Sequence, residues 1–318
     1  MNNKFEYKFF PIEKVGIYVP GGTASYPSTV LMNAIPALLA KVKKIIMVCP
    51  FLKRKLNPGT IYAAEKCKIK DIYCIGGAQA IAALAYGTKK IEKVNKIVGP
   101  GNKFVTAAKK EVFGDVGIDM IAGPSEVTVV ADKSSNPDWI ASDLIAQAEH
   151  DKFSQSILIS LSDDILKKVK YSIKKQLKIL PRKKIAQYSL NKHGLFIKSS
   201  SIYEIAKIIN NIAPEHLEIN IKKYNVLKNK VFNAGAIFLG EYSTEAVGDY
   251  LAGPNHVLPT SGAAKFASGL SVYDFLKRIS YVNLSKRGIE TLGPSVITLA
   301  DFEGLKGHSK SVKLRINK

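Results

Sequence analysis

Short apolar runs rich in β-branched residues alternate with segments of helical spacing between Val15 and Asp132. The run VGIYV precedes STVLMNAIPALLAKV, and KIIMVC precedes GTIYAAEKC. Strands that are apolar throughout, rather than at every second position, are typical of a parallel sheet covered by helices on both faces. The alternation therefore predicts an α/β fold in which a helix connects each strand to the next.

Each apolar run ends in a turn that contains glycine or proline. These turns are Pro20-Gly21-Gly22, Cys49-Pro50, Gly76-Gly77, Gly99-Pro100-Gly101 and Gly123-Pro124. In an open α/β sheet such turns lie at the carboxyl ends of the strands, where ligands bind and helix N-termini offer free N–H groups to phosphates. The same glycines could instead only close tight turns. Because no third glycine follows Gly99-Pro100-Gly101, the G-x-G-x-x-G motif of a standard dinucleotide-binding domain is missing.

A second series of strands and helices begins at VTVVAD, residues 127–132. Asn136-Pro137 predicts the N-terminus of a helix that runs to about His150, and Ser201-x-x-Glu204 predicts another that Pro214 ends. The stretch EYSTEAVGDYLAGPNHVLPTSG is too polar and glycine-rich for a core element. A basic, mostly helical tail follows, so we expect two α/β domains and a helical C-terminal tail.

The charge and cysteine content exclude several classes of protein. The net charge of +21 is typical of nucleic-acid binders, but most of the 47 basic residues are lysines rather than arginines. In DDILKKVKYSIKKQLKILPRKK the lysines occupy the faces of a helix that its apolar residues leave free. The sequence has neither a signal peptide nor an apolar run of about 18 residues. The three cysteines form no C-x-x-C pair. We expect a cytoplasmic protein that binds neither nucleic acid nor membrane.

Two pairs of residues have the chemistry of a catalytic or metal site. Gln147 and His150, three residues apart on one predicted helix, can converge on one point and could bind zinc with further donors. A helix-end histidine also commonly forms only local hydrogen bonds. Glu215 and His216 suit general base catalysis, although adjacent residues of a strand point to opposite faces and the pair could be a surface feature.

Eight segments, taken in order, resemble the histidinol dehydrogenase family. They are PIEKVGIYVPGGTASYPSTVLMNAIPA, GGAQAIAALAYGT, VGPGNKFVTAAKKEVFG, IDMIAGPSEVTVVAD, DLIAQAEHD, APEHLEI, GAIFLGEYSTEAVGDYLAGPNHVLPTSG and EGLKGHSKSV. The resemblance covers nearly everything from Pro11 onward. It implies a zinc- and NAD-dependent enzyme that oxidises L-histidinol through L-histidinal to L-histidine, the last two steps of histidine biosynthesis.

The resemblance also implies the architecture. The family has two incomplete Rossmann-like domains with parallel sheets, which hold the cofactor without a G-x-G-x-x-G loop. On this basis residues 1–17 are an N-terminal remnant, 18–126 an NAD-contacting domain, 127–270 a zinc and substrate domain, and 271–318 a helical tail that contributes to the partner subunit's site. We therefore expect a homodimer with shared active sites.

The residue roles follow by motif match. The resemblance assigns one zinc ion per subunit to Gln147, His150, Asp249 and His308. It assigns the substrate to these four and to Ser125, His216, His256 and Glu303. It assigns NAD to Tyr18, Gln79 and Asn102. His216 would accept the proton in both oxidations, and Glu215 would activate the water that hydrates the aldehyde.

The sequence departs from the family at three places. Phe10 and Lys265 stand where the family has arginine, and about ten residues precede Pro11 where the family has a longer segment. We expect an exposed apolar face, or another chain, where that segment would lie. Two other functions are a dehydrogenase of the same fold that acts on another small alcohol, and a shortened inactive remnant that serves as a basic binding protein.

Overall fold

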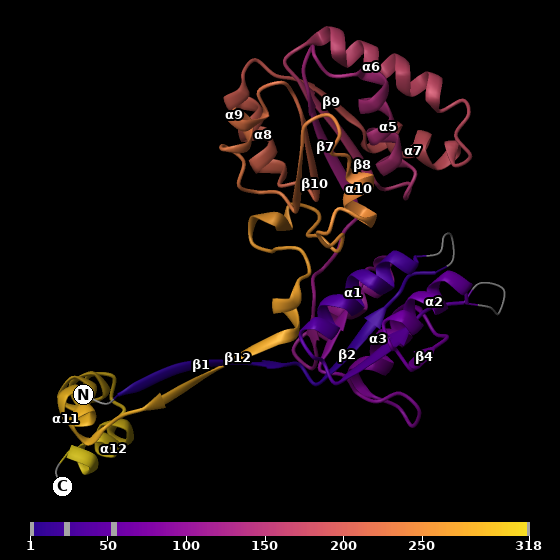
Figure 1. Cartoon of the computed structure of the whole chain (residues 1–318). Coiled ribbons are helices and arrows are strands. Elements are labelled where there is room, and N and C mark those ends of the chain that lie inside the picture. The colour runs from indigo at the N-terminus through magenta and orange to yellow at the C-terminus, as the bar shows by residue number, and fades with distance from the viewer. Residues whose placement is uncertain (1–2, 22–25, 52–55, 317–318) are drawn as a thin grey trace. The chain divides into compact units, whose positions relative to one another are not determined.

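The computed structural model describes residues 3–21, 26–51 and 56–316. The chain divides into two compact units: Ile12–Phe275, and a smaller unit that joins Met1–Pro11 to Leu276–Lys318 (Figure 1). Gly22 of the first turn lies outside the described residues. The finer domain boundaries given above stay a prediction. Within the described residues, no helix is both long and apolar enough to cross a bilayer.

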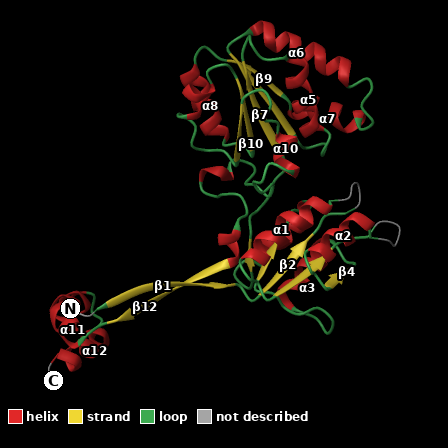
Figure 2. Ribbon diagram, viewed as in Figure 1, coloured by secondary structure: helices red, strands yellow, loops and turns green. Residues whose placement is uncertain are grey.

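The first sheet of the larger unit is parallel, with helices in every connection (Figure 2). Its strands, in spatial order, are β4 (Asp71–Tyr73), β3 (Lys44–Val48), β2 (Lys14–Tyr18), β5 (Lys96–Val98) and β6 (Gly117–Ile118). Its helices are α1 (Pro27–Leu39), α2 (Pro58–Lys66), α3 (Gly77–Tyr86) and α4 (Lys103–Glu111). The strand order reverses between β2 and β5. The crevice at their carboxyl ends is therefore the switch point at which folds of this kind bind ligands.

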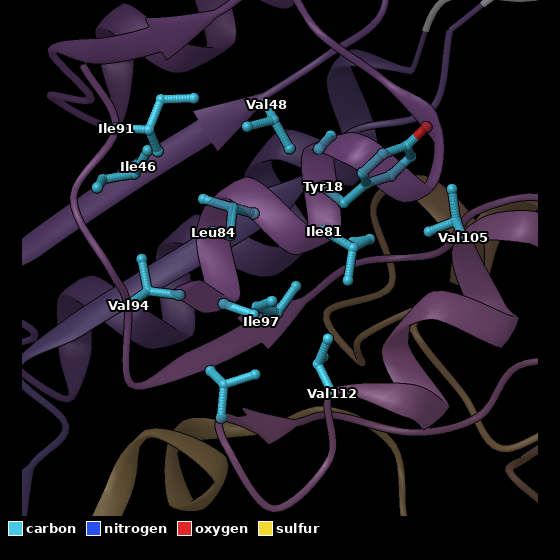
Figure 3. Packing of buried hydrophobic residues seen from close by; sticks show 13 residues of the cluster. Tyr18, Ile46, Val48, Ile81, Leu84, Ile91, Val94, Ile97, Val105 and Val112 are labelled. Carbon is cyan, nitrogen blue, oxygen red and sulfur yellow. The ribbon is translucent and has the colours of Figure 1, made fainter. Parts of the chain in front are cut away.

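Helices α3 and α4 pack on one face of this sheet (Figure 3). Leu84 of α3 is fully buried, and a Cβ at Gly16 of β2 would lie 2.8 Å from its Cδ1 atom. Glycine at that position therefore lets the helix approach the sheet closely. Burying a leucine side chain contributes about 1.5–3 kcal/mol to folding, so this contact is one of the stronger links between sheet and helix.

The second sheet is also parallel and repeats the same connectivity. Its strands, in spatial order, are β11 (Ala236–Leu239), β10 (His216–Asn220), β7 (Glu126–Ala131), β8 (Gln155–Ser160) and β9 (Leu195–Lys198). The helices between its strands are α5 (Pro137–Ala148), α6 (Asp163–Gln176), α7 (Lys183–His193), α8 (Ile202–Ile212) and α9 (Tyr224–Lys228). Two parallel sheets flanked by helices confirm the predicted α/β fold class.

The capping and burial patterns follow the sequence closely. The Asn136 side chain caps α5 and the Ser201 side chain caps α8. Helix α6 buries Leu166, Val169 and Ile173 against the second sheet, and its lysines are exposed. The turn-rich stretch that follows β11 contains the short helix α10 (Glu245–Tyr250) and the 3-10 turns η1 (Ala263–Lys265) and η2 (Val272–Phe275).

The smaller unit contains strands as well as helices. β1 (Lys4–Pro11) pairs with β12 (Leu276–Asn283) in an antiparallel ribbon, and α11 (Lys286–Phe302) packs on α12 (Lys306–Ile316). The tail is therefore not helical throughout. The run KFEYKFFP alternates polar and aromatic residues, and this period-two pattern is typical of a strand.

Candidate active site

A cavity of about 810 Å³ lies within the larger unit. The turns after β5 and β6 of the first sheet line one side, and residues at the amino ends of β7, β8 and β10 of the second sheet line the other. The catalytic and substrate-binding residues that the sequence predicts and that lie in this cavity are Ser125, His150, Glu215, His216, Asp249 and His256.

Glu215 and His216 reach the cavity because helix α8 ends abruptly before them. Ala213 caps the helix in the left-handed conformation with a φ of 52°, and Pro214 cannot continue it. Glu215 precedes β10 and His216 is its first residue, so strand alternation does not separate the two side chains. Both line the cavity and are almost fully buried. The pair is therefore not a surface feature.

Burial controls the ionisation of Glu215. Its carboxyl group is fully buried, and this burial raises its pKa well above the ordinary value. The backbone N–H of Glu126 donates to Oε2 at 3.0 Å and opposes the shift. The ionised carboxylate of Glu215 is therefore more basic than that of an exposed glutamate.

The contacts of His216 define which ring nitrogen is basic. Nδ1 lies 3.2 Å from the carbonyl oxygen of Glu126. A carbonyl oxygen only accepts, so Nδ1 carries the proton and Nε2 carries the lone pair. Nε2 is buried without a hydrogen-bond partner among the described residues and lies 3.7 Å from Oδ1 of Asp249. Burial lowers the His216 pKa to about 4, so the imidazole is neutral at pH 7.

Helix α10 places two carboxyl groups beside this histidine. Glu245 and Asp249 are four residues apart and therefore lie on the same face of the helix. The Oε1 atom of Glu245 lies 3.6 Å from Nδ1 of His216. Burial raises the pKa of the Glu245 carboxyl group. His216, Glu245 and Asp249 offer ligand atoms within 4.8 Å of one another, a spacing that could hold a metal ion. No sequence motif pointed to Glu245, which lies four residues before Asp249.

Gln147 is a buried side chain whose amide group lacks the hydrogen bonds that a core residue normally has. It is 0% exposed, and neither its amide oxygen nor its amide nitrogen has a hydrogen-bond partner among the described residues. An unsatisfied buried amide costs free energy, and a metal–oxygen bond would offset that cost. The amide oxygen of Gln147 is therefore free to bind a metal ion, although Gln147 is not among the residues that line the cavity with His150 and Asp249.

His150 lies two residues beyond the end of helix α5, which was predicted to run to about this residue. The helix ends at Ala148 with Glu149 as its C-cap, and the N–H of His150 donates to the carbonyl of Gln147 at 3.2 Å. His150 is exposed and lines the cavity.

The remaining predicted residues divide between the two units. In the cavity, Ser125 hydrogen bonds to Glu215, and Nδ1 of His256 donates to the carbonyl oxygen of Asp249 at 3.0 Å. Glu303 is the C-cap of α11 and His308 lies in α12, both exposed in the smaller unit. The cavity described here includes neither of them.

The three predicted cofactor residues lie on the first sheet. Asn102 follows β5, lines the cavity and caps α4 by accepting hydrogen bonds from Phe104 and Val105. Tyr18 ends β2, is buried, and its hydroxyl accepts from the N–H of Gly77 at 3.1 Å. Gln79 is exposed on α3. Tyr18 and Gln79 are not among the residues that line the cavity.

Comparison with known proteins gives a consistent result. The family model described as histidinol dehydrogenase matches residues 2–316. The chain is 63% identical to a histidinol dehydrogenase of Pelagibacter ubique, over 100% of this chain and 74% of that protein. It is 52% identical to one of Bacillus cereus, over 96% of this chain and 71% of that protein.

Solved structures agree. A histidinol dehydrogenase from Elizabethkingia anophelis matches with a TM-score of 0.95 at 42% identity, over 100% of this chain and 76% of that chain. A propionaldehyde dehydrogenase from Clostridium phytofermentans matches with a TM-score of 0.53 at 11% identity, over 89% of this chain and 80% of that chain. The second likeness concerns the fold alone.

Proposed function

The chain belongs to the histidinol dehydrogenase family, NAD-dependent oxidoreductases of histidine biosynthesis that act on L-histidinol, and from this we propose how its residues divide the work. We propose that the cavity of the larger unit oxidises L-histidinol to L-histidine in two steps, through L-histidinal. The observation that carries this proposal is the buried, neutral His216, whose Nε2 lone pair faces Asp249 without a partner among the described residues.

Substrate and metal would share one group of residues. Gln147, His150 and Asp249 would hold one zinc ion per subunit, together with the partner subunit's His308. The unsatisfied amide of Gln147 supports this set. When bound there, zinc supplies a Lewis acid that orients the imidazole and amino nitrogens of the substrate. Ser125, His256 and the partner subunit's Glu303 would complete the substrate site.

His216 would act as the general base. Its Nε2 atom accepts the proton of the substrate's hydroxyl group. A hydride leaves the carbon that carries this hydroxyl group and passes to NAD. The second oxidation, of the hydrated aldehyde, repeats this transfer. Since His216 needs its lone pair for protons, the alternative metal set of His216, Glu245 and Asp249 is incompatible with this role.

Glu215 would activate water between the two oxidations. Its carboxylate accepts a proton from a water molecule, whose oxygen adds to the carbonyl carbon of L-histidinal as the C=O π bond breaks. The proton then passes to the former carbonyl oxygen, which gives the hydrate. The raised pKa of Glu215 makes its carboxylate a stronger base than an ordinary glutamate. The contact with the Glu126 N–H keeps the side chain directed at the cavity.

The cofactor would bind at the switch point of the first sheet. We assign its contacts to Tyr18, Gln79 and Asn102, of which Asn102 lines the cavity. The reversal of strand order between β2 and β5 supports this position. A homodimer would follow from the partner residues named above.

The decisive experiment is a count of NADH. Purified protein with zinc and NAD is given limiting L-histidinol, and NADH is measured by absorbance. Oxidation of an alcohol to an acid removes two hydrides, so we expect two NADH per L-histidinol. One NADH with release of aldehyde would contradict the two-step route. Turnover of other small alcohols at a higher kcat/KM would favour a different substrate, and no turnover by folded, metal-loaded protein would favour the inactive remnant.

A further inference from the structure

We propose that the buried ion pair of Lys109 and Asp119 is a positioning device that shapes the turn between β5 and α4, residues 99–102, to receive the dinucleotide. This rests on the proposed function, in which Asn102 of that turn contacts NAD. Neither Lys109 nor Asp119 was singled out by the sequence motifs.

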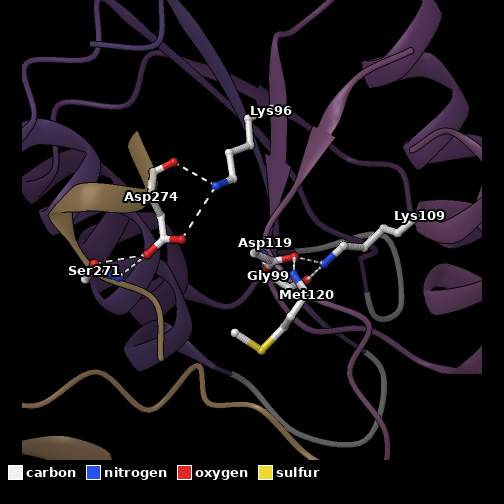
Figure 4. Close-up of polar contacts among 7 residues, drawn as sticks. All are labelled: Lys96, Gly99, Lys109, Asp119, Met120, Ser271 and Asp274. Atoms are coloured by element: carbon white, nitrogen blue, oxygen red, sulfur yellow. Dashed lines mark hydrogen bonds and ion pairs between the residues drawn. The ribbon is translucent and has the colours of Figure 1, made fainter. Parts of the chain in front are cut away.

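The pair binds both the N–H group and the carbonyl oxygen of Gly99 (Figure 4). Nζ of Lys109 donates to the carbonyl oxygen of Gly99 at 3.0 Å and forms an ion pair with Oδ1 of Asp119. Oδ2 of Asp119 accepts from the N–H of Gly99 at 2.7 Å, and Oδ1 accepts from the N–H of Met120 at 2.7 Å. The ion pair therefore binds Gly99 from two sides and connects the ends of β5 and β6 to the body of α4.

The backbone that the pair holds has an unusual conformation. Gly99 has a φ of 108°, and a Cβ atom there would lie 2.1 Å from the carbonyl oxygen of Tyr18. The turn thus runs directly against the carboxyl end of β2, at the switch point. Glycine can adopt many other backbone conformations. The two hydrogen bonds between Gly99 and the ion pair restrict it to this one.

Burial indicates that the pair determines conformation more than stability. The Lys109 and Asp119 side chains are 4% and 1% exposed. Removing two charges from water costs several kcal/mol per ion, and apolar residues of similar size often stabilise a core equally well. The pair also neutralises itself, so Lys109 is not a free cation for a phosphate. Its specific effect is to fix the Gly99 backbone.

The turn is directly connected to the cavity. Gly99, Asn102, Lys109 and Asp119 all line it. Asn102 lies three residues after the held glycine, and its side-chain oxygen accepts from Phe104 and Val105 at 3.0 and 3.2 Å. A change in the Gly99 backbone would therefore move the residue assigned to NAD, whereas the substrate residues assigned to this subunit, from Ser125 to His256, lie outside this turn.

The test compares Michaelis constants. The double variant Lys109→Met with Asp119→Asn removes both charges and so leaves neither one buried alone. We expect its KM for NAD and its Kd for NADH, measured by fluorescence, to rise at least about 10-fold, because misplaced contacts weaken binding steeply. The KM for L-histidinol should change by less than about 2-fold. The two single variants complete a double-mutant cycle that measures the interaction between Lys109 and Asp119.

The chain offers a matched control at the other end of the same strand. Nζ of Lys96 donates to the carbonyl oxygen of Asp274 at 2.7 Å and pairs with its carboxylate at 3.7 Å (Figure 4). Lys96→Met removes a partly buried ion pair from β5 and removes no hydrogen bond of the turn. It should lower the unfolding midpoint and leave the KM for NAD unchanged.

The outcomes separate the positioning role from the proposed function. An unchanged KM for NAD in the folded double variant, or an equal rise in Lys96→Met, overturns the positioning role. Asn102→Ala tests the cofactor assignment itself. If it raises the KM for NAD while the double variant does not, only the positioning role fails. If neither changes it, the cofactor site lies elsewhere and the proposed function needs revision.

Discussion

His216 shows how one buried side chain acquires a single chemical role. The carbonyl oxygen of Glu126 fixes the proton on Nδ1, and burial keeps the ring neutral. The lone pair of Nε2 is then available at all pH values above about 4. An exposed histidine would instead be mostly protonated at pH 6. The environment of the ring therefore keeps it neutral, which the proposed role as general base requires.

Replacing this base is the first prediction. His216→Asn keeps a polar side chain of smaller size but removes the basic nitrogen. We expect kcat to fall by at least about 100-fold, which is the usual contribution of a general base. Zinc content, measured by atomic absorption, should stay at the wild-type level because His216 is not a proposed ligand. A variant that retains full turnover would contradict the base role, whereas one that loses its metal would argue for the His216, Glu245 and Asp249 metal set.

The sequence identified most side chains of the site but not their states. Glu215, His216 and Gln147 lie in recognisable motifs. The unsatisfied amide of Gln147 and the tautomer of His216 depend on neighbours far away in the chain. Glu245 was missed because its proximity to His216 arises only when α10 packs beside β10.

At the level of elements, the β5–α4 turn combines positive φ with close packing. Gly99→Ala would place a methyl group against the Tyr18 carbonyl. We expect a loss in the free energy of unfolding above the roughly 1–3 kcal/mol that a left-handed alanine costs alone. Gly114→Ala is the matched control, since Gly114 has a φ of 113° and nothing within 4 Å of the added Cβ. Urea unfolding measures both, and equal losses would show that the close approach is unimportant.

The α11–α12 pair should respond to acid. Asp301 of α11 accepts from Nζ of Lys306 and from Nζ of Lys313, each at 3.0 Å, and these contacts lower its pKa to about 2. An unfolded aspartate has a pKa of about 3.9. The stabilisation is thus fully present above that pH and is lost as pH falls toward about 2.

Hydrogen exchange in α12 measures this effect. Protection should fall between about pH 4 and pH 2 in the wild-type protein, and Asp301→Asn should lower protection at neutral pH and flatten the dependence. Asp164→Asn, which removes an exposed ion pair with Lys168 in α6, is the control and should leave α12 unchanged. The same steep acid response in Asp301→Asn would assign the effect to another group.

Sequence patterns within short windows predicted the strands and helices of the two parallel sheets well, and predicted the smaller unit poorly. Caps and apolar runs give most helices and strands because each is encoded within a short window. β1 and β12 are stabilised by pairing with each other, for example Phe5 with Val282. No local window contains both strands, so the ribbon could not be predicted.

At the scale of the whole molecule, the two sheets contribute opposite edges to the cavity. The glycine turns correctly indicated the carboxyl ends of the first sheet. The second sheet instead presents the amino ends of β7, β8 and β10. The general rule for ligand sites in α/β sheets would have placed them at the opposite edge. Only the resemblance to a family pointed to residues there, and their roles stay a prediction.

The proposed shared sites predict complementation between inactive subunits. His216→Asn and His308→Ala should each be nearly inactive. When the two are unfolded together and refolded, half of the dimers are mixed, and each mixed dimer has one intact site. We expect about one quarter of wild-type activity. Sites built within single chains would give no recovery, and size-exclusion chromatography with light scattering checks that dimers form.

The antiparallel pairing of β1 with β12 also sets an order of events during synthesis. β1 leaves the ribosome before the other described elements, yet the strand that pairs with it begins at Leu276. The sheets of Ile12–Phe275 can assemble while translation continues, because domains fold as they emerge. The ribbon can form only after Leu276–Asn283 has been synthesised. Throughout that interval the exposed aromatic residues of β1 are available to a nascent-chain chaperone.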